Sequence, residues 1–412
     1  MLTRRQFLGQ SALALAGTTL VPPFLARAAH AAQEGSAVSR YGDETVLVVI
    51  QMSGGNDGLN TVVPYGLDGY RDARPTLAMN EHEVLPLTDR LGLHPEMSGL
   101  HELYRAGRVA IVQGVGYPNP NLSHFRSLDI WHTAAPDTFE STGWLASSLA
   151  ATDLAHENPI YAASVTDGLI RALHGNGASV PTIASLPAYQ LRTDGRYPND
   201  RPGRLGYANW VCGLDYGTKA LEGQIARTAA TALASSERVQ QAAAAYTSLV
   251  EYPAFPLANS LKTVATLMAG ELGTRIYYVA FGGFDTHSAQ PSAQARLLGG
   301  FSNSVAAFFA DLGDLGKAEN VMLMTFSEFG RRVNENGSQG TDHGTAGPMF
   351  LIGPRVRGGL YGEHPSLTDL DSNKNLQFGI DFRAVYGTAL EGWLGADQET
   401  VLGASYESVG FV

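Results

Sequence analysis

Short apolar runs recur along the chain and have the length and composition of buried β-strands. They lie at residues 45–52, 109–112, 275–280, 321–326 and 349–352. Segments with apolar residues at helical spacing occur between them, for example residues 96–106 and 296–315. Because buried strands that alternate with amphipathic helices form parallel sheets, the pattern predicts an α/β sandwich with a mostly parallel central sheet flanked by helices.

The middle of the chain, residues 140–260, carries weaker signals. Ala-rich segments at residues 217–250 and 259–269 predict helices, whereas the Pro-, Gly- and Arg-rich residues 197–206 indicate a long loop. The sheet pattern resumes after this block. We therefore expect residues 40–412 to form a single α/β domain, with residues 140–260 as a mid-chain insertion that is an elaboration or a lid.

The N-terminus has the composition of an export signal. Arg4 and Arg5 precede an apolar run at residues 12–25 that Gly and Pro interrupt, and small residues follow at 26–32. This pattern predicts a twin-arginine signal peptide over residues 1–32, a partnership with the twin-arginine export machinery, and a periplasmic or extracellular location. An ordinary secretory signal or a membrane anchor remains the alternative. No other stretch is long and apolar enough to span a bilayer, so we expect no stable membrane span after signal removal.

The remaining composition narrows the chemistry. Removing residues 1–32, which contain three arginines and no acidic residue, takes the formal net charge from −11 to −14. An acidic chain disfavours nucleic acid as a partner. Cys212 is the only cysteine, which excludes an intramolecular disulfide and a cysteine-based zinc site. The twin-arginine route carries folded proteins, often with a cofactor already bound, and so favours a metal or another prosthetic group.

Acidic and imidazole side chains follow the predicted strands. They are Asp57, Asp285, His287 and Glu328. Ligands of open α/β sheets bind at the carboxyl ends of the strands, so we expect these side chains to meet there. Asp285 and His287, two residues apart just past a strand, are a typical way to present two ligands to one metal ion. For Asp57 the sequence leaves open a plain Gly-rich turn in which the carboxylate caps a helix.

Two further segments carry candidate chemistry. Asp342 and His343 precede the run at residues 349–352, and their loop is expected to bring an imidazole to the same sheet edge as Glu328. An ordinary loop histidine and a helix cap at Glu328 are the alternative. Ser123 follows an extended Pro-rich loop at the predicted start of a helix, which suits a nucleophile that attacks an anionic ester. Serine is also a common helix N-cap residue, so a capping role remains open.

The set of motifs resembles a known family. The motifs are the signal segment, Gly54-Gly55-Asn56-Asp57-Gly58-Leu59-Asn60, Ser123-His124-Phe125, Phe284-Asp285-Thr286-His287, Ser327-Glu328-Phe329-Gly330-Arg331 and Asp342-His343-Gly344. Together they resemble the bacterial proteins grouped as domain of unknown function 1501, over nearly the whole chain. That family is placed with the alkaline phosphatase, sulfatase and phosphodiesterase superfamily. The resemblance implies an alkaline phosphatase/sulfatase-like sandwich and metal-assisted attack on a phosphate or sulfate ester.

The resemblance also implies roles for residues, and the fit is partial. The superfamily's nucleophile falls at Ser123 and its last histidine at His343. Its Asp-His pair after a strand aligns with Glu328 and Phe329, so the acid is changed and the imidazole is lost. One metal site, from Asp285, His287 and His343, is expected to survive. The second, from Asp57, Ser123 and Glu328, is in doubt, because phenylalanine cannot bind a metal ion.

The sequence thus yields a set of candidate residues and two functions. The residues are Ser123 and Arg331 for catalysis; Asp57, Asp285, His287, Glu328, Asp342 and His343 for a metal; and Asn56, His124 and Arg126 for the substrate. We expect a divalent metal ion, with zinc favoured, since two imidazoles and one carboxylate suit a borderline ion. The first function is a metal-dependent hydrolase of phosphate or sulfate esters, with a small anionic ester or sugar as ligand. The alternative is a non-catalytic exported binding or scaffold protein on a hydrolase-like fold.

Overall fold

The computed structural model describes residues 45–152, 158, 160–175, 178–190, 198–217 and 220–412. The chain divides into a main unit of residues 44–190 and 237–412 and a second unit of residues 1–43 and 191–236. The expected signal peptide, residues 1–32, lies outside the described residues. Among the helices that are described, none is long and apolar enough to cross a membrane.

A mixed, mostly parallel sheet forms the centre of the main unit. Its strands are β1 (Val46–Ser53), β5 (Val109–Gly116), β6 (Ala162–Val165), β7 (Ile276–Gly282), β8 (Val321–Phe326), β9 (Gly347–Ile352), β10 (Gly359–Tyr361) and β11 (Ile380–Asp381). They follow the order β10-β5-β9-β8-β1-β7-β6, with β11 also paired to β5. Only β9 runs antiparallel, against both β5 and β8. All the strands predicted from apolar runs are therefore confirmed within one sheet.

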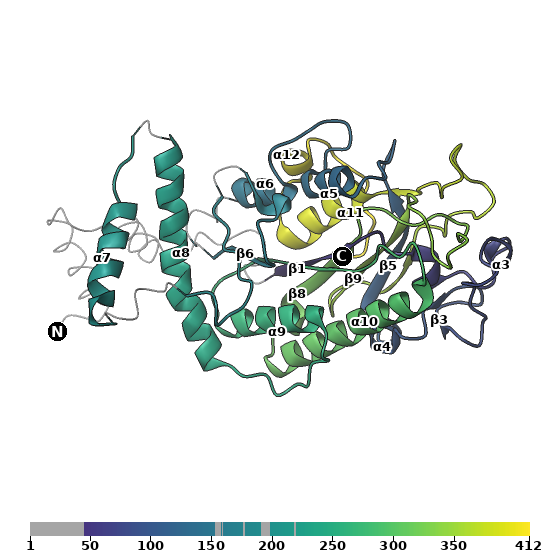
Figure 1. Ribbon diagram of the computed structural model, residues 1–412, viewed down its shortest axis with the longest axis horizontal. Coiled ribbons are helices and arrows are strands. Elements are labelled where there is room, and N and C mark those ends of the chain that lie inside the picture. Colours follow the sequence, from purple (N-terminus) through teal and green to yellow (C-terminus); the bar gives the residue numbers. More distant parts are fainter. Residues whose placement is uncertain (1–44, 153–157, 159, 176–177, 191–197, 218–219) are drawn as a thin grey trace. The chain divides into compact units, whose positions relative to one another are not determined.

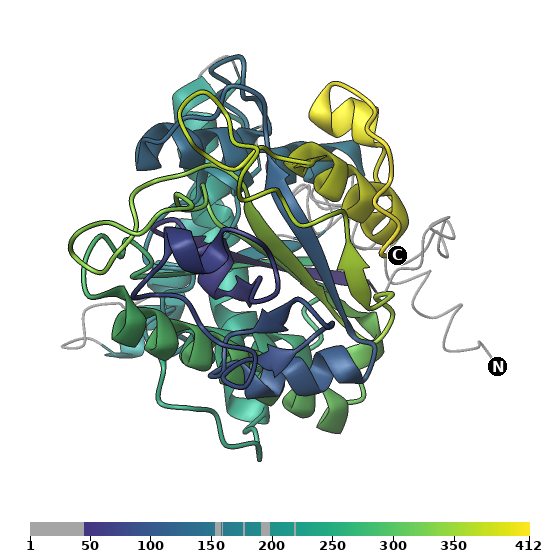
Figure 2. The same ribbon diagram turned by 90° about the vertical axis from the view of Figure 1, so that its right-hand side faces the viewer.

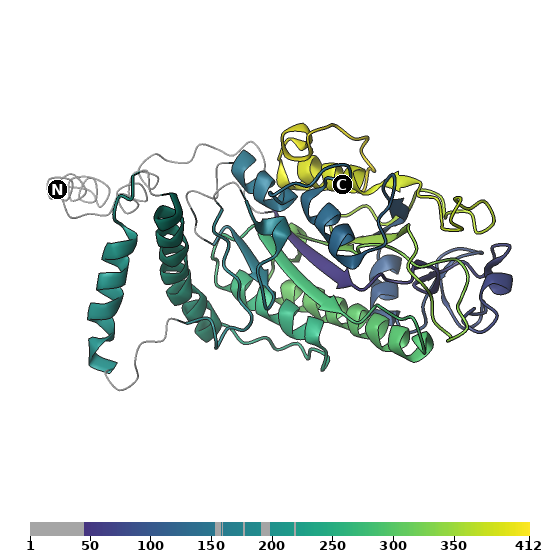
Figure 3. The same ribbon diagram turned by 45° about the horizontal axis from the view of Figure 1, so that its top comes forward.

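Helices cover both faces of this sheet, as Figures 1 and 2 show. One face packs on α4 (Ser98–Arg105), α9 (Pro256–Ala269) and α10 (Gln290–Asp314). The other packs on α5 (His124–Thr133), α6 (Trp144–Ala151), α11 (Phe382–Ala389) with its extension Leu390–Leu394, and α12 (Gln398–Leu402). Val48 and Ile50 of β1 face the first layer, whereas Leu47 and Val49 face the second. The purple β1 accordingly lies between two helical layers in Figure 3, and the predicted sandwich is confirmed.

A smaller layer caps one end of the main sheet. It contains the three-stranded antiparallel sheet β2 (Val62–Val63), β4 (Gly92–Leu93) and β3 (Leu85–Pro86), with the short helices η1 (Gly58–Asn60) and α3 (Tyr70–Ala73). Its apolar side chains form a separate cluster that includes Leu59, Tyr70 and Val333. This layer contacts β9 through η1 and so supports the loops at the carboxyl edge of the main sheet.

The middle of the chain differs from its prediction in two respects. Strand β6, helix α6 and the turn η3 (Arg171–Leu173) lie within residues 140–190 and belong to the main unit. In the second unit, residues 197–206 were expected to be a loop, but η4 (Pro198–Asp200) and α7 (Arg201–Cys212) occupy most of them. The Pro that suggested a loop sits at the first positions of α7, where its missing N–H costs no intrahelical bond. The predicted Ala-rich helix is confirmed as α8 (Ala220–Ala245), and a lid role for this region stays a prediction.

Asp57 is a buried structural carboxylate. Both of its oxygens bind the Arg74 guanidinium, at 2.5 and 2.9 Å, and neither side chain is exposed to solvent. Asp57 also accepts the Leu59 N–H as the cap of η1 and a hydrogen bond from Gln290 of α10. In the structure the oxygens of Asp57 are taken by Arg74, Leu59 and Gln290, so a metal-binding role for Asp57 stays a prediction that these contacts do not support. The capping alternative describes its local role.

Replacing the Asp57 carboxylate tests whether its role is structural. Asp57→Asn leaves the Arg74 guanidinium buried without a counter-charge, so we expect a loss of about 3–5 kcal/mol in the free energy of unfolding. Urea unfolding measures this loss, and mass spectrometry of the purified protein measures bound metal per chain, which should equal that of the wild type. Asp72→Asn, on the exposed side of α3, is the matched control. A stable Asp57→Asn protein that loses metal contradicts the structural assignment.

His132 of α5 lies among buried polar side chains between α5 and the central sheet. Its Nε2 is 2.9 Å from Gln51 Oε1 and 3.0 Å from the Tyr278 hydroxyl. Burial lowers the pKa of His132 to about 4, because the charged imidazolium would lose its hydration there. A histidine whose folded pKa lies below its unfolded value of about 6.5 contributes stability above that pH. This contribution is lost as the pH falls from 6.5 towards 4.

The pH dependence of unfolding tests this environment. Between pH 6.5 and 5, protonation of His132 in the unfolded chain should lower the free energy of unfolding by about 2 kcal/mol. His132→Gln removes this contribution and should reduce the pH dependence over this window in denaturant titrations at each pH. His94, whose pKa burial also lowers to about 4, keeps its own contribution. His82→Gln, at an exposed position, should keep the wild-type slope. An equal slope in wild type and His132→Gln would refute the burial argument.

Candidate functional site

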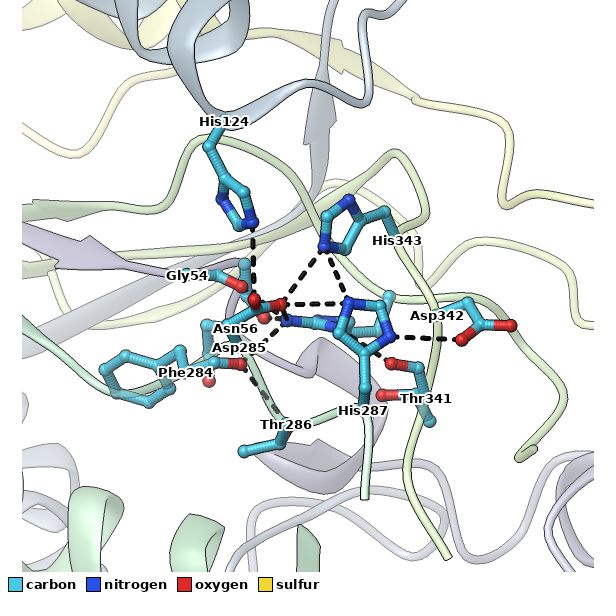
Figure 4. Close-up of polar contacts among 12 residues, drawn as sticks. Gly54, Asn56, His124, Phe284, Asp285, Thr286, His287, Thr341, Asp342 and His343 are labelled. Atoms are coloured by element: carbon cyan, nitrogen blue, oxygen red, sulfur yellow. Dashed lines mark hydrogen bonds and ion pairs between the residues drawn. The ribbon is translucent and has the colours of Figure 1, made fainter. Parts of the chain in front are cut away.

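Five loops bring polar side chains together at the carboxyl edge of the central sheet, as Figure 4 shows. They follow β1, β7 and β8, precede α5, and precede β9. Because β9 is antiparallel to β8, the residues before β9 lie at the edge where β8 ends. The site therefore combines segments that are distant in sequence. Its central side chains are His124, Asp285, His287 and His343.

The carboxylate of Asp285 lies at the centre of this group. Its Oδ1 is 3.1 Å from Nε2 of His287 and 3.1 Å from Nε2 of His343. These two nitrogens are 3.0 Å apart, so the three atoms form a nearly equilateral triangle. On the other side of the carboxylate, His124 Nε2 lies 3.5 Å from Oδ2. Figure 4 shows all three imidazoles directed at Asp285.

Each imidazole is oriented from behind by an oxygen acceptor at its Nδ1. The pairs are His124 with Glu328 Oε1 at 2.9 Å, His287 with Asp342 Oδ1 at 3.1 Å, and His343 with the Leu122 carbonyl at 2.9 Å. An ionised carboxylate or a carbonyl accepts hydrogen bonds and donates none, so each Nδ1 carries the proton. A neutral ring then presents the lone pair of Nε2 to Asp285, whereas a ring that also carries a proton on Nε2 donates it to that carboxylate. Metal-binding histidines in proteins are oriented in this way.

This arrangement satisfies a simple test for a cation. Lone pairs of His287, His343 and Asp285 face one another at contact distance, which is unfavourable without a proton or a metal ion between them. Two zinc ligands at about 2.0–2.1 Å in a tetrahedron lie about 3.4 Å apart, close to the observed separations. His124, Asp285 and His343 also place ligand atoms within 4.8 Å of one another and form a possible metal site. The donor set of imidazole and carboxylate suits zinc or a similar borderline ion.

Arg331 holds the carboxylate in place. Its Nη2 donates to Asp285 Oδ1 at 2.8 Å, and its remaining N–H groups bind backbone carbonyls of Gly54, Gly55, Phe284 and Thr341. Burial alone would raise the pKa of Asp285, but the hydrogen bonds from Arg331 and His343 outweigh it and lower that pKa to about 2. The Arg331 side chain is fully buried. In the structure Arg331 positions Asp285, and the catalytic role expected for it stays a prediction.

Two predicted metal ligands lie one layer behind the imidazoles. Glu328 is 1% exposed and its Oε1 accepts the backbone N–H of Gly54 at 2.8 Å in addition to His124. Asp342 accepts from Asn336 as well as from His287, and these hydrogen bonds lower its pKa. Both carboxylates therefore act on the centre through a histidine. Direct contact of Glu328 and Asp342 with a metal ion stays a prediction that this placement does not support.

Two residues expected to bind substrate are engaged elsewhere. Arg126 pairs with Asp129 at 2.7 Å and donates to the carbonyls of Pro136 and Thr138. Asn56 is 3% exposed, and its Oδ1 accepts from Thr61 and Gln294. Both side chains are held by contacts within the protein, and their substrate-binding roles stay predictions. The sequence around Arg126 and Asn56 contains no pattern that distinguishes contacts within the protein from contact with a substrate.

Ser123 and Phe329 flank the centre. Ser123 is exposed and its hydroxyl makes no hydrogen bond with the described residues, although its neighbours Leu122 and His124 both contribute to the centre. Phe329 is 4% exposed and its ring lies 4.4 Å from that of His343 and 4.9 Å from that of His124. A Cβ on Gly55 would collide with the Phe329 ring, which explains the glycine there. Phe329 thus places an apolar ring beside the centre, at the position where the resemblance implied a metal-binding histidine.

The structure adds His124 as a direct member of the centre, where the sequence had suggested substrate binding. Its position as the first residue of α5, directly after the expected nucleophile, places its ring over Asp285. A histidine at a helix N-terminus carries no metal-ligand spacing of its own. Its place in the centre becomes evident only in the structure, where the start of α5 lies beside the loops after β7 and β8.

Comparison with solved structures finds distant likenesses. The chain matches the crystal structure of Ps i-CgsB in complex with k-i-k-neocarrahexaose with 10% identity and a TM-score of 0.38, covering 88% of this chain and 73% of that chain. It matches the PsFucS1 sulfatase from Pseudoalteromonas sp. with 11% identity and a TM-score of 0.35, covering 90% and 70%. It matches alkaline phosphatase from the Antarctic bacterium TAB5 with 10% identity and a TM-score of 0.28, covering 76% and 92%. Similarity at this level transfers no activity, so the chemistry must come from the site's own residues.

A comparison with curated proteins gives no match. The family model described as protein of unknown function (DUF1501) matches residues 44–403, which include every side chain of the centre. The chain belongs to this DUF1501 family.

Proposed function

We propose that the protein is a metal-dependent hydrolase of phosphate or sulfate esters with a single metal centre. The observation that carries the proposal is the set of three imidazoles whose Nδ1 atoms are held by acceptors and whose Nε2 atoms converge on Asp285. Where the rings are neutral, their Nε2 lone pairs and the Asp285 carboxylate repel one another, and a divalent cation bound between them relieves this repulsion.

His124, Asp285, His287 and His343 are the residues that would hold the ion. When bound, a divalent ion supplies positive charge that polarises an ester oxygen and stabilises the charge that develops on it. Arg331 fixes Asp285, while Glu328 and Asp342 keep two of the imidazoles in the tautomer that can bind. The ring of Phe329 excludes water from one side of the centre, which strengthens every electrostatic interaction there.

Ser123 is the proposed nucleophile. Its backbone lies between Leu122, whose carbonyl orients His343, and His124 of the centre. In the proposed reaction its hydroxyl oxygen bonds to the phosphorus or sulfur atom, the alcohol leaves with the hydroxyl proton, and water then releases phosphate or sulfate and restores the serine. The free hydroxyl at the N-terminus of α5 supports this role.

One observation favours a second candidate, a non-catalytic metal-binding or ligand-binding protein. Phe329 replaces an imidazole, and Asp57 and Glu328 are committed to Arg74 and His124. These residues therefore form no second metal site, and a two-metal clamp on the attacking and leaving oxygens is not available. A single ion can still support hydrolysis, so the two candidates separate by turnover and not by metal content.

Export completes the proposal. The arginine-led N-terminal segment supports transport by the twin-arginine machinery to the periplasm or beyond. That route delivers proteins already folded, so the centre would be loaded before export. The acidic mature chain is consistent with a small-molecule ligand and not with nucleic acid.

Metal binding is the first test. His343→Ala removes one converging lone pair, so bound zinc or manganese per chain should fall at least about tenfold in metal analysis, and the gain in thermal stability on adding either ion should disappear. His82→Ala is the control, since His82 is exposed. Wild-type protein that contains no stoichiometric metal and gains no stability from zinc or manganese would overturn the proposed metal centre.

Turnover is the second test. With 4-nitrophenyl phosphate and 4-nitrophenyl sulfate as substrates, Ser123→Ala should reduce kcat at least about 10³-fold for the active ester while metal content stays unchanged. Ser405→Ala, at an exposed position, is the control. Metal-loaded wild type that hydrolyses neither ester supports the binding-protein candidate. Full activity in Ser123→Ala would remove the serine from the mechanism.

A further inference from the structure

A large cavity adjoins the centre, and the proposed metal centre and nucleophile do not account for it. Its volume is about 710 Å³, and its walls include Leu122, Glu328 and Phe329 of the centre. A phosphate or sulfate group fills only a small part of such a space, which falls in the range of about 300–1,000 Å³ typical of ligand pockets. The cavity therefore has room for the alcohol part of an ester whose anionic group lies at the centre.

Arg332 gives the cavity an available positive charge. It lies next to Arg331 in sequence, but its guanidinium makes no hydrogen bond or ion pair with the described residues. The acid opposite it in the cavity is Asp371, whose oxygens accept from the backbone of Asn373 and Asn375. Arg332 is half-buried, and an unpaired guanidinium in such a place favours a carboxylate or another anion.

Asn375 supplies an acceptor that lacks a donor. Its side chain is 2% exposed and its Nδ2 donates to Asp371 at 3.3 Å, but its Oδ1 has no hydrogen-bond partner among the described residues. A buried acceptor without a donor costs about 1–3 kcal/mol, so such groups are rare outside functional sites. Asn375 lines the cavity, but Oδ1 itself has almost no accessible surface, so a ligand in the cavity does not reach this atom.

Aromatic and amide groups complete the walls. Phe378 lines the cavity and is 37% exposed, and Trp131 lies in the same wall. Asn373 and Gln377 add exposed amides. Apolar ring faces beside amides suit a molecule that has C–H faces and many hydroxyls, which is the chemistry of a sugar.

We propose that this cavity binds an acidic carbohydrate, with a carboxylate on Arg332 and hydroxyls on the exposed amides of Asn373 and Gln377. The sugar is the alcohol part of the ester cleaved at the centre, a link that rests on the proposed function. Binding itself needs no turnover. It is therefore measured apart from hydrolysis.

The test uses defined disaccharides and the full-length mature protein loaded with zinc. Digalacturonic acid and cellobiouronic acid are the acidic probes, and maltose and cellobiose are their neutral counterparts. Titration calorimetry and saturation-transfer NMR measure binding at low salt. The acidic probes should bind at least about tenfold more tightly than the neutral ones. Arg332→Gln should abolish this preference, whereas Arg105→Gln, on the exposed side of α4, should retain it.

A second pair of variants separates recognition from folding. Asn373→Ala should weaken the binding of all the sugars about tenfold. Phe378→Ala, at a partly exposed position, should do so without a change in the unfolding temperature. Equal binding of acidic and neutral sugars, a preference that survives Arg332→Gln, or no binding of any probe overturns the proposal. Sugar binding with no ester hydrolysis keeps the cavity assignment and rejects only its link to the centre.

Discussion

The shared carboxylate of Asp285 is the interaction on which the arrangement of the site depends. Arg331 binds it from the protein interior at 2.8 Å. The imidazole of His287 approaches it from the same loop, and those of His124 and His343 approach it from two other segments. Arg331 simultaneously ties the carbonyls of the loop after β1 and of the loop before β9. One buried guanidinium therefore sets both the charge state of Asp285 and the relative position of the loops that carry its neighbours.

The topology of the sheet explains how His343 arrives. Strand β9 runs against β5 and β8, so its N-terminal loop returns to the carboxyl edge instead of the opposite one. In a fully parallel sheet the residues before a strand would lie far from those after its neighbours. The antiparallel direction of β9 therefore brings the imidazole of His343 to the polar side chains of the loops after β7 and β8.

The sequence predicted the strands and the group Asp285, His287 and His343, because buried apolar runs and polar strand ends leave local patterns. It failed where the outcome depends on a distant partner. Asp57 and Asp285 are both acids after strands, but Arg74, 17 residues further along the chain, captures the first. Likewise, Pro near residue 200 indicated a loop, whereas its place in the first turn of α7 makes it compatible with a helix. Neither fact is local to the motif that suggested the wrong role.

The charge balance of the site links the centre to the cavity. Asp285, Glu328 and Asp342 are three carboxylates around the imidazoles, and Arg331 is the one guanidinium bonded to them, which leaves a formal charge of −2. A divalent ion neutralises this charge and leaves no excess for the anionic group of an ester. Any further negative charge on the ligand must then be met outside the centre. Arg332 follows Arg331 in sequence and lines the adjoining cavity. It makes no hydrogen bond or ion pair with the described residues, although its charge acts on Asp342 and Asp371, so it is the cation placed to meet that charge.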